Sequence, residues 1–509
     1  MNDHGFADFR MGQAIPRAMV PQLPFEEFRR SVVDAAADGQ RVAALFGNLP
    51  DPAGAVELYA VLADGRRSLL SVAKTTVDSD RFPSLTPDCP QVHLFEREFA
   101  EQYGVRPEGH PWFKPVRFHA SYRPGHDAWG RDSSEPPVVG VTDFYRVEGE
   151  EIHEVAVGPI HAGVIEPGHF RFQCHGEQVF HLEISLGYQH RGLERTLAGG
   201  PGKRTIHLME QAAGDTSVGH ATAYCQTVET LAGVEPPLRS QAIRGIALEL
   251  ERLANHTGDL GALAGDVGFL PTASYCGRIR GDFLNLTALL CGSRFGRGLI
   301  RPGGVGFDLE AGRIEQCLQR LDGAFRDVAG AAGLLFNSLS VQARFEGTGA
   351  ISSDTAIALG IVGPAARACG LEGDVRHDFP SGIFRFAHVA VSSWATGDVF
   401  ARAYVRWLEI QRSVAFIKDQ LRAFPAGPIR ADVGPLKPDH LAVSLVEGWR
   451  GEICHAALTD DQGRFSRYKI VDPSFHNWIG LAMALRDQQI SDFPLCNKSF
   501  NLSYCGHDL

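Results

Sequence analysis

The hydrophobic pattern of this chain changes its period partway along, and that change limits the folds open to it. In the first part, short apolar runs at Val56–Leu62 and Ser68–Ala73 flank Asp64-Gly65, a combination typical of a β-hairpin. In the rest, Arg239–His256 and Val399–Ile417 repeat apolar residues at helical spacing. The pattern predicts an α+β protein: a small N-terminal α/β sheet domain, then a mainly helical domain with small β elements.

The segment Pro124–Pro137 is rich in Gly, Pro, Asp and Ser and has no periodicity, which is typical of a linker. At 509 residues the chain is long enough for at least two domains. We therefore expect a first domain over residues 1–123, a linker over 124–150 and a second domain over 151–509.

Local patterns predict individual elements within both domains. Phe25–Ala37 and His93–Tyr103 have helical spacing, and Gly104 is placed to end the second helix. Two further hairpins are predicted, from Gly168–Cys174 with Gln178–Ile184 and from Glu452–Leu458 with Ser466–Ile470.

Composition excludes several functions. The net charge of -11, with no dense Lys/Arg cluster, argues against nucleic-acid binding. No apolar run approaches the roughly 20 residues that span a bilayer, and Met1–Gly5 carries no secretion signal, so we expect a cytoplasmic location. The ten cysteines contain no C-x-x-C pair, and we expect most of them to be small buried residues in a reducing compartment.

A first resemblance lies in the sheet domain. The run from Glu96-Arg97-Glu98 to Tyr103-Gly104-Val105, continued by Gly109–Arg117, resembles the signature of the small peripheral-arm (30 kDa-like) subunit of respiratory complex I. In that family the segment is thought to build a subunit interface. The resemblance therefore implies a helix and loop that dock one domain on another.

A second resemblance covers the chain from Gly158 onward. Its motifs are Gly158–Gly163, Ile165–Arg171, Leu186–Glu194, Glu249–His256, Arg301–Val305 and Asp472–Trp478. In this order they resemble the complex I quinone-site (49 kDa-like) subunit. They are more closely similar to large subunits of membrane-bound energy-converting nickel–iron hydrogenases of the formate hydrogenlyase type, in which both regions are also fused.

Those hydrogenases hold their metals with two C-x-x-C pairs, because soft thiolates bind nickel and iron. The first pair belongs to a pattern that fits Glu210–His220 without a gap, but Ala213 and Thr216 occupy the cysteine positions. At the second pair Cys505 can match one cysteine, while Leu502 occupies the other position. The resemblance therefore implies a chain that binds no nickel–iron centre, and we expect no metal and no cofactor of its own.

Two other uses of the same region stay open. His220, Cys225, Cys505 and His507 could converge into a zinc or iron site, although packing with neutral residues is the favoured interpretation. The quinone-headgroup histidine and tyrosine of the complex I subunit fall on Ile165 and Gly214, so neither is present.

Three residues are candidates for remaining chemistry. Glu166 falls where hydrogenases keep a proton-passing carboxylate, and desolvation near a buried centre favours proton exchange by a glutamate. The alternative for Glu166 is a salt bridge to Arg171 or a helix-end contact. His161 and His169 lie in the same motifs, with fixing a turn as the alternative role for His161; His190 and Arg191 are more often structural.

A charged set in the helical region has helical or turn spacing, which favours paired charges between helices. It comprises Arg376-His377-Asp378, Asp398, Arg402, Arg406 and Glu409. In the complex I relatives such residues help connect the quinone cavity to the membrane arm, so the resemblance also allows a coupling role.

The resemblance implies a non-metallated, hydrogenase-like subunit of a membrane-associated, complex I-related redox and ion-translocating complex, acting in docking and energy coupling. The alternative is an NADH- or quinone-linked oxidoreductase component that uses the remodelled cavity. The implied partners are an iron–sulfur small subunit, which would carry the cluster, and antiporter-like membrane subunits. Such a hetero-oligomer would place the chain on the inner face of the cell membrane.

Overall fold

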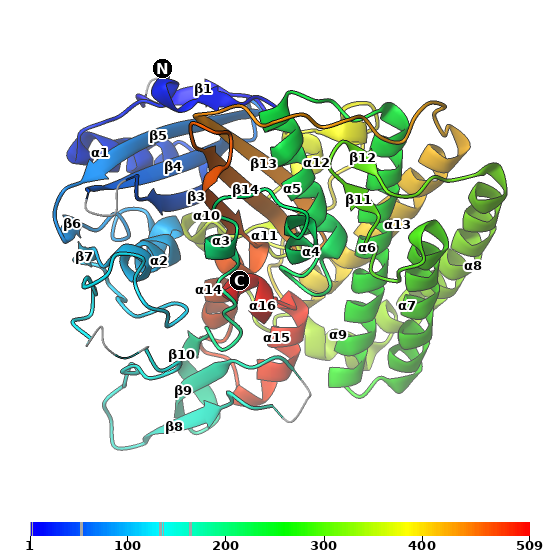
Figure 1. Ribbon diagram of the computed structural model, residues 1–509. Helices are drawn as coiled ribbons and strands as arrows, with labels where there is room; N and C mark the ends of the chain where they lie inside the picture. Colours follow the sequence, from blue (N-terminus) through cyan, green and yellow to red (C-terminus); the bar gives the residue numbers. More distant parts are fainter. Residues whose placement is uncertain (1, 3, 51–53, 132–134, 136, 162–164) are drawn as a thin grey trace.

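The computed structural model describes residues 2, 4–50, 54–131, 135, 137–161 and 165–509. The first region holds an antiparallel sheet in the order β1-β5-β4-β3 (Figure 1). Its strands are β1 (Ala7–Phe9), β3 (Arg41–Asn48), β4 (Val56–Asp64) and β5 (Leu69–Val77). The predicted hairpin is confirmed as β4 and β5, and the two predicted helices as α1 (Phe25–Ala37) and α2 (His93–Tyr103).

Gly104 and Gly47 show why glycine is required at two points of this region. Gly104 ends α2 in the left-handed conformation, with φ 69°, as its position predicts. Gly47 in β3 lies against α2, and a Cβ there would come within 2.2 Å of the Tyr103 ring. The Tyr103 hydroxyl donates to the carbonyl oxygen of Gly47 at 2.7 Å, so the helix and the strand are held in close contact.

The second four-stranded sheet has the order β15-β14-β13-β2 and lies in the middle of the molecule (Figure 1). Its strands are β2 (Ile15–Pro16), β13 (His440–Gly448), β14 (Gly451–Thr459) and β15 (Phe465–Val471). The predicted hairpin of β14 and β15 is confirmed. The N-terminal strand β2 was not predicted; it pairs with the start of β13, where Ile15 lies opposite Leu441.

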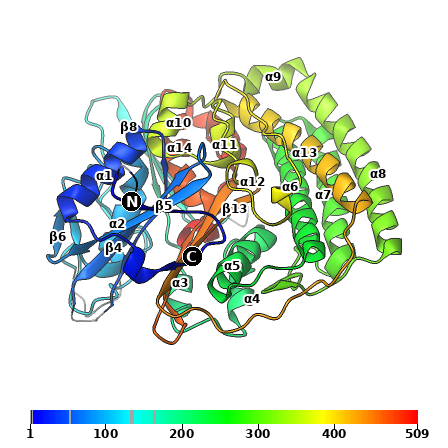
Figure 2. The same ribbon diagram turned by 90° about the horizontal axis from the view of Figure 1, so that it is seen from above.

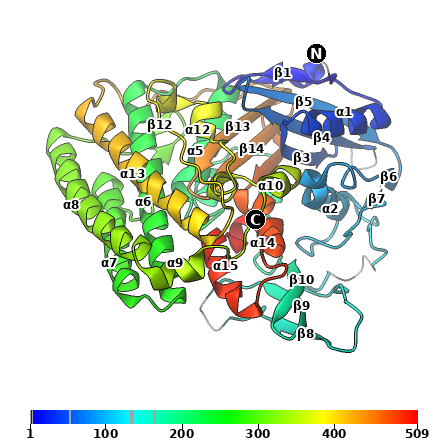
Figure 3. The same ribbon diagram turned by 180° about the vertical axis from the view of Figure 1, so that it is seen from behind.

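Four long helices form a bundle on the opposite side of this sheet from the first region (Figures 1 and 3). They are α6 (Leu238–Asp266), α7 (Leu270–Cys291), α8 (Ala311–Phe336) and α13 (Val399–Arg422). The helices predicted at Arg239–His256 and Val399–Ile417 are confirmed and extend further toward their C-terminal ends. Seen from above, α5 (Ser217–Ala232) lies between the bundle and the sheet, where it packs on β13 and β14 (Figure 2).

A third sheet, in the order β10-β9-β8, lies at the lower edge in Figure 1. Its strands are β8 (Ile152–Val157), β9 (His169–His175) and β10 (Gln178–Ser185), which confirms the remaining predicted hairpin. The C-terminal helices are α14 (Pro473–Ala484), α15 (Phe493–Phe500) and α16 (Tyr504–Asp508). The other strands are β6 (Arg81–Pro83), β7 (Arg106–Glu108), β11 (Ile300–Arg301) and β12 (Gly304–Val305).

Short helices complete the described part of the chain. The α-helical ones are α3 (Leu193–Thr196), α4 (Thr205–Met209), α9 (Leu339–Phe345), α10 (Ser353–Leu359), α11 (Gly363–Arg367) and α12 (Val375–Asp378). The 3₁₀ turns are η1 (Arg17–Met19), η2 (Pro90–Val92), η3 (Gly382–Arg385) and η4 (Ile490–Asp492).

The hydrophobic core of the first region is completed by residues from the end of the chain. Leu441, Val443 and Phe475 are buried in the same cluster as Phe28 and Phe46. The helical bundle has a separate, larger core. The linker at 124–150 remains a prediction about chain organisation, since the two regions share apolar packing around the central sheet.

A cluster of buried charges, which we call the seam, joins α2 and its following loop to the central sheet. The seam consists of Glu98, Arg117, Glu194, Arg467 and Lys469, with side chains at most 7% exposed. The Lys469 ammonium lies 2.6 Å from Glu98 and 3.1 Å from Glu194, and Arg467 lies 2.8 Å from Glu194. Each buried charge has an opposite partner, which buried charges require for stability.

Candidate functional site

The loop between β8 and β9 carries His161 and Glu166, and His169 is the first residue of β9. The two histidines hold the ends of the loop together. His161 Nε2 donates to the carbonyl oxygen of Gly168 at 2.8 Å, and His169 Nδ1 donates to that of Gly158 at 3.2 Å. His169 Nε2 accepts from Arg171 Nε at 3.2 Å, so a neutral ring satisfies both contacts. Burial lowers the pKa of His169, which agrees with that neutral state.

Glu166 lies against the C-terminal helix α16. Its carboxylate accepts the backbone N–H of Tyr504 at 3.3 Å and a hydrogen bond from the Cys505 thiol. Burial raises the pKa of the Cys505 thiol, and the charge of Glu166 raises it further. The salt bridge to Arg171 considered for Glu166 is not formed, because Arg171 pairs with Glu154; the helix-end contact is the one observed.

Arg191 forms hydrogen bonds with both of the segments that the resemblance assigns to the metal site. Its guanidinium donates to the carbonyl oxygens of Gln211 at 2.6 Å, Ala212 at 2.9 Å and Cys505 at 2.8 Å. His190 Nδ1 donates to the Asp508 carbonyl oxygen at 2.7 Å. The start of α5 and the C-terminal helix therefore meet, as the resemblance implies.

We call Ala213, Thr216, Leu502 and Cys505 the ligand positions, after the cysteines of the resembling hydrogenases. Ala213 and Leu502 are buried and carry no donor atom. The Thr216 hydroxyl donates to Asp215 at 3.2 Å and accepts from Arg450 at 3.3 Å. A nickel–iron pair needs several thiolates, and the residues at these positions offer one thiol, so they do not fit that group.

The possible Cys/His metal cluster is not assembled either. His220 binds Asp472 and His455, at 3.0 and 3.1 Å, while His507 Nδ1 lies 2.9 Å from its neighbour Asp508. Among the described residues, no three His, Cys, Asp or Glu side chains converge in a geometry that could hold a metal ion. Nine of the ten cysteines are buried and Cys505 is half-buried, and all ten are free thiols, as predicted for most of them.

Gly214, which matches the tyrosine position of the complex I subunit, is exposed. A Cβ at Gly214 would meet no atom within 4 Å. Ile165, at the histidine position, is half-buried in the loop that carries Glu166. The two quinone-headgroup positions therefore lie at the same site as Glu166 and Cys505, without the residues that would bind the headgroup.

Glu251 lies in the motif Glu249–His256, but the sequence gave no indication of its role. Its side chain lies at the start of α5, just after the ligand position Thr216. Its carboxylate accepts the backbone N–H groups of Val218 and Gly219 at 2.7 and 3.1 Å, so it caps the N-terminus of α5 from α6. Burial raises the pKa of Glu251 to about 8, although both hydrogen bonds act in the opposite direction. Only the approach of α5 to α6 makes this contact, so no local pattern could have predicted it.

Part of the predicted charged set forms ion pairs between elements, as its pattern indicates. Arg402 instead binds Ser499 and two backbone carbonyl oxygens, and His377 pairs with the adjacent Asp378. Glu409 binds Arg367 at 2.7 Å and Arg252 at 3.1 Å, and Arg406 binds Asp259 at 2.7 Å. Asp398 instead caps the N-terminus of α13. These groups lie inside the bundle and do not converge with Glu166.

Family models match the two regions separately. The description "Respiratory-chain NADH dehydrogenase, 30 Kd subunit" matches residues 30–129, and "Respiratory-chain NADH dehydrogenase, 49 Kd subunit" matches residues 266–440. The class defined by fold and site is therefore a fusion of two complex I-like modules.

Individual relatives that match most of this chain define its family more closely. Hydrogenase-4 component G of Escherichia coli (strain K12) is 30% identical over 88% of this chain and 79% of its own length. Formate hydrogenlyase subunit 5 of the same organism is 29% identical over 92% and 84%. A component of the NADH-quinone oxidoreductase of Clostridium beijerinckii is 32% identical over 60% and 83%. The chain belongs to the complex I-related family of hydrogenase and NADH-quinone oxidoreductase subunits.

The described helices contain no segment that is both long enough and apolar enough to cross a membrane.

Proposed function

We propose that this chain is a non-metallated, hydrogenase-like subunit of a membrane-associated, complex I-related complex, in which it acts in docking and energy coupling. The observation that carries the proposal is the packing of the ligand positions. Ala213, Thr216 and Leu502 are at most 4% exposed, and the Thr216 hydroxyl is already engaged by Asp215 and Arg450. Side chains fill the places that thiolates would need.

Metal analysis of the purified complex tests this proposal. We expect less than about 0.1 nickel per chain, because one thiol cannot hold a metal pair that needs several thiolates. A nickel–iron hydrogenase purified from the same cells serves as the positive control for metal supply. One nickel per chain would overturn the proposal.

Exposed apolar side chains around the candidate loop support docking. Val138, Val141 and Ile160 are 67%, 70% and 87% exposed. The ring of Phe144 lies 5.1 Å from that of His169, which brings the segment 138–145 beside the loop. Exposed apolar side chains of this kind are typical of an interaction surface. An iron–sulfur small subunit would dock here, and through it antiporter-like membrane subunits would hold the chain on the inner face of the membrane.

Co-purification tests the docking face. Ile160→Asp should reduce the recovered iron–sulfur subunit at least tenfold, because the new charge would be buried at the interface. Leu270→Asp, at a 66% exposed position at the start of α7, serves as the matched control and should leave recovery unchanged. Equal recovery with both variants would remove this face as the docking site.

Glu166 is the proposed proton-passing group of the site, with His161 and His169 as residues that position its loop. The contact of Glu166 with Cys505 and Tyr504 supports this assignment. Glu166→Gln should abolish proton movement coupled to turnover of the complex, and Glu166→Asp should restore part of it. Unchanged proton movement in the glutamine variant would show that Glu166 is structural.

A second candidate function is a quinone- or NADH-linked oxidoreductase component that uses the remodelled cavity. The similarity to a component of the NADH-quinone oxidoreductase of Clostridium beijerinckii supports it. Organic extraction of the purified complex should then yield bound quinone. Gly214→Leu, at the tyrosine position, should reduce that binding, whereas Gly277→Leu, at an equally exposed glycine in α7, should not. Absence of quinone and of NADH binding would exclude this candidate.

A further inference from the structure

Four side chains form a continuous hydrogen-bonded row from the central sheet to the C-terminal helices. Tyr468 of β15, His455 of β14, His220 of α5 and Asp472 at the start of α14 are all at most 1% exposed. The Tyr468 hydroxyl lies 2.9 Å from His455 Nδ1, His455 Nε2 lies 3.1 Å from His220 Nδ1, and His220 Nε2 lies 3.0 Å from Asp472 Oδ2. We call this row the buried relay.

The carboxylate of Asp472, at one end of the buried relay, sets the direction of the hydrogen bonds along it. Burial acts to raise the pKa of Asp472, but the hydrogen bond from His220 and nearby positive charge hold it below its ordinary value, so Asp472 is a carboxylate that only accepts. His220 Nε2 therefore donates to Asp472, and a neutral His220 ring then accepts at Nδ1. His455 then donates from Nε2 and accepts the Tyr468 proton at Nδ1.

The other groups around the row agree with this arrangement. Burial holds the pKa of His455 well below its ordinary value, so its ring is neutral, and burial raises the pKa of Tyr468. The charges that face the row are Glu194 near His455, and Arg450 near Asp472. All hydrogen bonds in the row therefore point the same way, from the phenol to the carboxylate.

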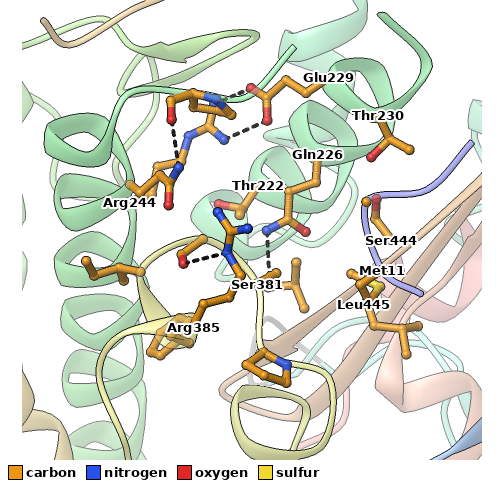
Figure 4. Close-up of a pocket in the computed structure, with 18 of the residues that line it drawn as sticks. Met11, Thr222, Gln226, Glu229, Thr230, Arg244, Ser381, Arg385, Ser444 and Leu445 are labelled. Atoms are coloured by element: carbon orange, nitrogen blue, oxygen red, sulfur yellow. Dashed lines mark hydrogen bonds and ion pairs between the residues drawn. The ribbon is translucent and has the colours of Figure 1, made fainter. Parts of the chain in front are cut away.

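One end of the buried relay reaches a cavity. The Tyr468 hydroxyl contacts Thr227, whose hydroxyl oxygen lies 3.0 Å from that of Ser444 and 2.9 Å from the Ala223 carbonyl oxygen. Ser444 lines a cavity of about 400 Å³, together with Thr222 and Gln226 of α5 (Figure 4). The exposed side chains of Arg385 and Lys437 also line this cavity, so solvent reaches it.

The other end reaches the candidate site. Asp472 lies against Gly506 of α16, where a Cβ would come within 2.8 Å of Asp472 Oδ2. Glycine at this position allows the close approach. The same short helix carries Cys505, which contacts Glu166.

We propose that Tyr468, His455, His220 and Asp472 exchange protons between the solvent-filled cavity at Ser444 and the C-terminal helix at the candidate site. The phenol proton moves to His455 Nδ1, the His455 Nε2 proton to His220 Nδ1, and the His220 Nε2 proton to Asp472. Three bonds to hydrogen break and three form, and no electron is transferred. The phenolate regains a proton from the cavity through Thr227 and Ser444.

Both imidazole rings are held on two sides, so the row resets by the reverse transfer. The buried relay therefore equilibrates protons between its ends and does not carry them in one direction only. A directional flow would need a step at the candidate site that removes the proton from Asp472.

Hydrogen–deuterium exchange of the ring N–H groups tests this inference in the full chain with ¹⁵N-labelled histidine. We expect both rings to carry a proton at Nε2. Their N–H groups should exchange at least tenfold faster than the backbone amides of β14 and β15, because exchange along the row needs no strand opening. Tyr468→Phe should slow ring exchange at least tenfold while those amides keep their rates.

A second variant and a control variant complete the experiment. Thr227→Val cuts the row at its cavity end without touching a ring, and it should slow ring exchange in the same way. His476→Gln replaces a buried histidine outside the row, whose pKa burial lowers to about 3, and should change nothing at His220 or His455. Ring exchange that matches the backbone amides, or ignores both Tyr468→Phe and Thr227→Val, would overturn the inference. The measurement needs no partner or turnover and is independent of the function proposed above.

Discussion

The seam and the ligand positions both lie at contacts between distant parts of the chain, but they consist of different kinds of side chain. The seam contains five charged side chains, each with an opposite partner. The ligand positions contain Ala213, Thr216, Leu502 and one neutral thiol, Cys505. A buried charge depends on its partner, whereas a buried apolar side chain needs only to fill its volume. The seam should therefore be intolerant of replacement, and the ligand positions should accept side chains of similar size.

The largest effect is expected at the seam. Lys469→Met keeps the length of the side chain but leaves Glu98 and Glu194 without their shared cation. We expect a loss of about 3 to 5 kcal/mol in the free energy of unfolding, measured by denaturant titration. Arg81→Gln, which breaks an exposed pair with Glu108, serves as the control and should have almost no effect. A loss as small as that of the control would contradict the role given to the seam.

At the ligand positions, volume should decide the outcome. Leu502→Ala should lower the free energy of unfolding by about 2 to 5 kcal/mol because it leaves a cavity. Leu502→Met, which keeps the volume, should cost less than about 1.5 kcal/mol. The same denaturant titration compares Leu502→Met with Lys469→Met, and equal losses would end the contrast between the two regions.

Close packing beside the seam gives the next effect. Gly47→Ala places a methyl group against the Tyr103 ring, and we expect it to destabilise the protein by about 1 to 3 kcal/mol. Gly434→Ala, at a glycine without a positive φ and with nothing within 4 Å, serves as the control without the steric clash. Thermal unfolding should show the larger loss for Gly47→Ala.

Glu251 gives the smallest effect over one pH unit. It sharpens the comparison because its raised pKa keeps this buried carboxyl group mostly uncharged near neutral pH, unlike the paired charges of the seam. Its folded pKa, about 8, lies above the ordinary value of 4.5, so the folded protein binds more protons than the unfolded chain between these values. Stability should therefore fall as pH rises, by at most about 1.4 kcal/mol per pH unit. Unfolding curves at about pH 6.5 and 7.5 should show this slope in the wild type and not in Glu251→Gln.

The elements that the sequence predicted correctly are those formed by residues close together in the chain. Helices α1 and α2 and the three hairpins follow from periodicity and turn residues. The pairing of β2 with β13 could not be predicted, because two residues near the N-terminus carry no register information for a strand about 425 positions later. The contrast shows that non-local strand pairing lies beyond what a window of sequence encodes.

The candidate site likewise contains some residues that the sequence indicated and others that it did not. The family pattern located Glu166, His161, His169 and the ligand positions, and the structure brings Glu166 to Cys505. His455 and Tyr468 lie on strands whose residues are almost all buried, so their types gave no signal that they face His220. Their hydrogen bonds depend on three elements meeting, which only the folded chain shows.

The shared core around the central sheet has a consequence for synthesis. Leu441, Val443 and Phe475 belong to the core of the first region, so that core cannot close while the ribosome is still translating the helical bundle. Domains usually fold as units during synthesis, starting from the N-terminus. Here the nascent N-terminal sheet must wait, with part of its apolar surface uncovered, for residues made more than 300 positions later. Dependence on a ribosome-associated chaperone would follow from this chain order.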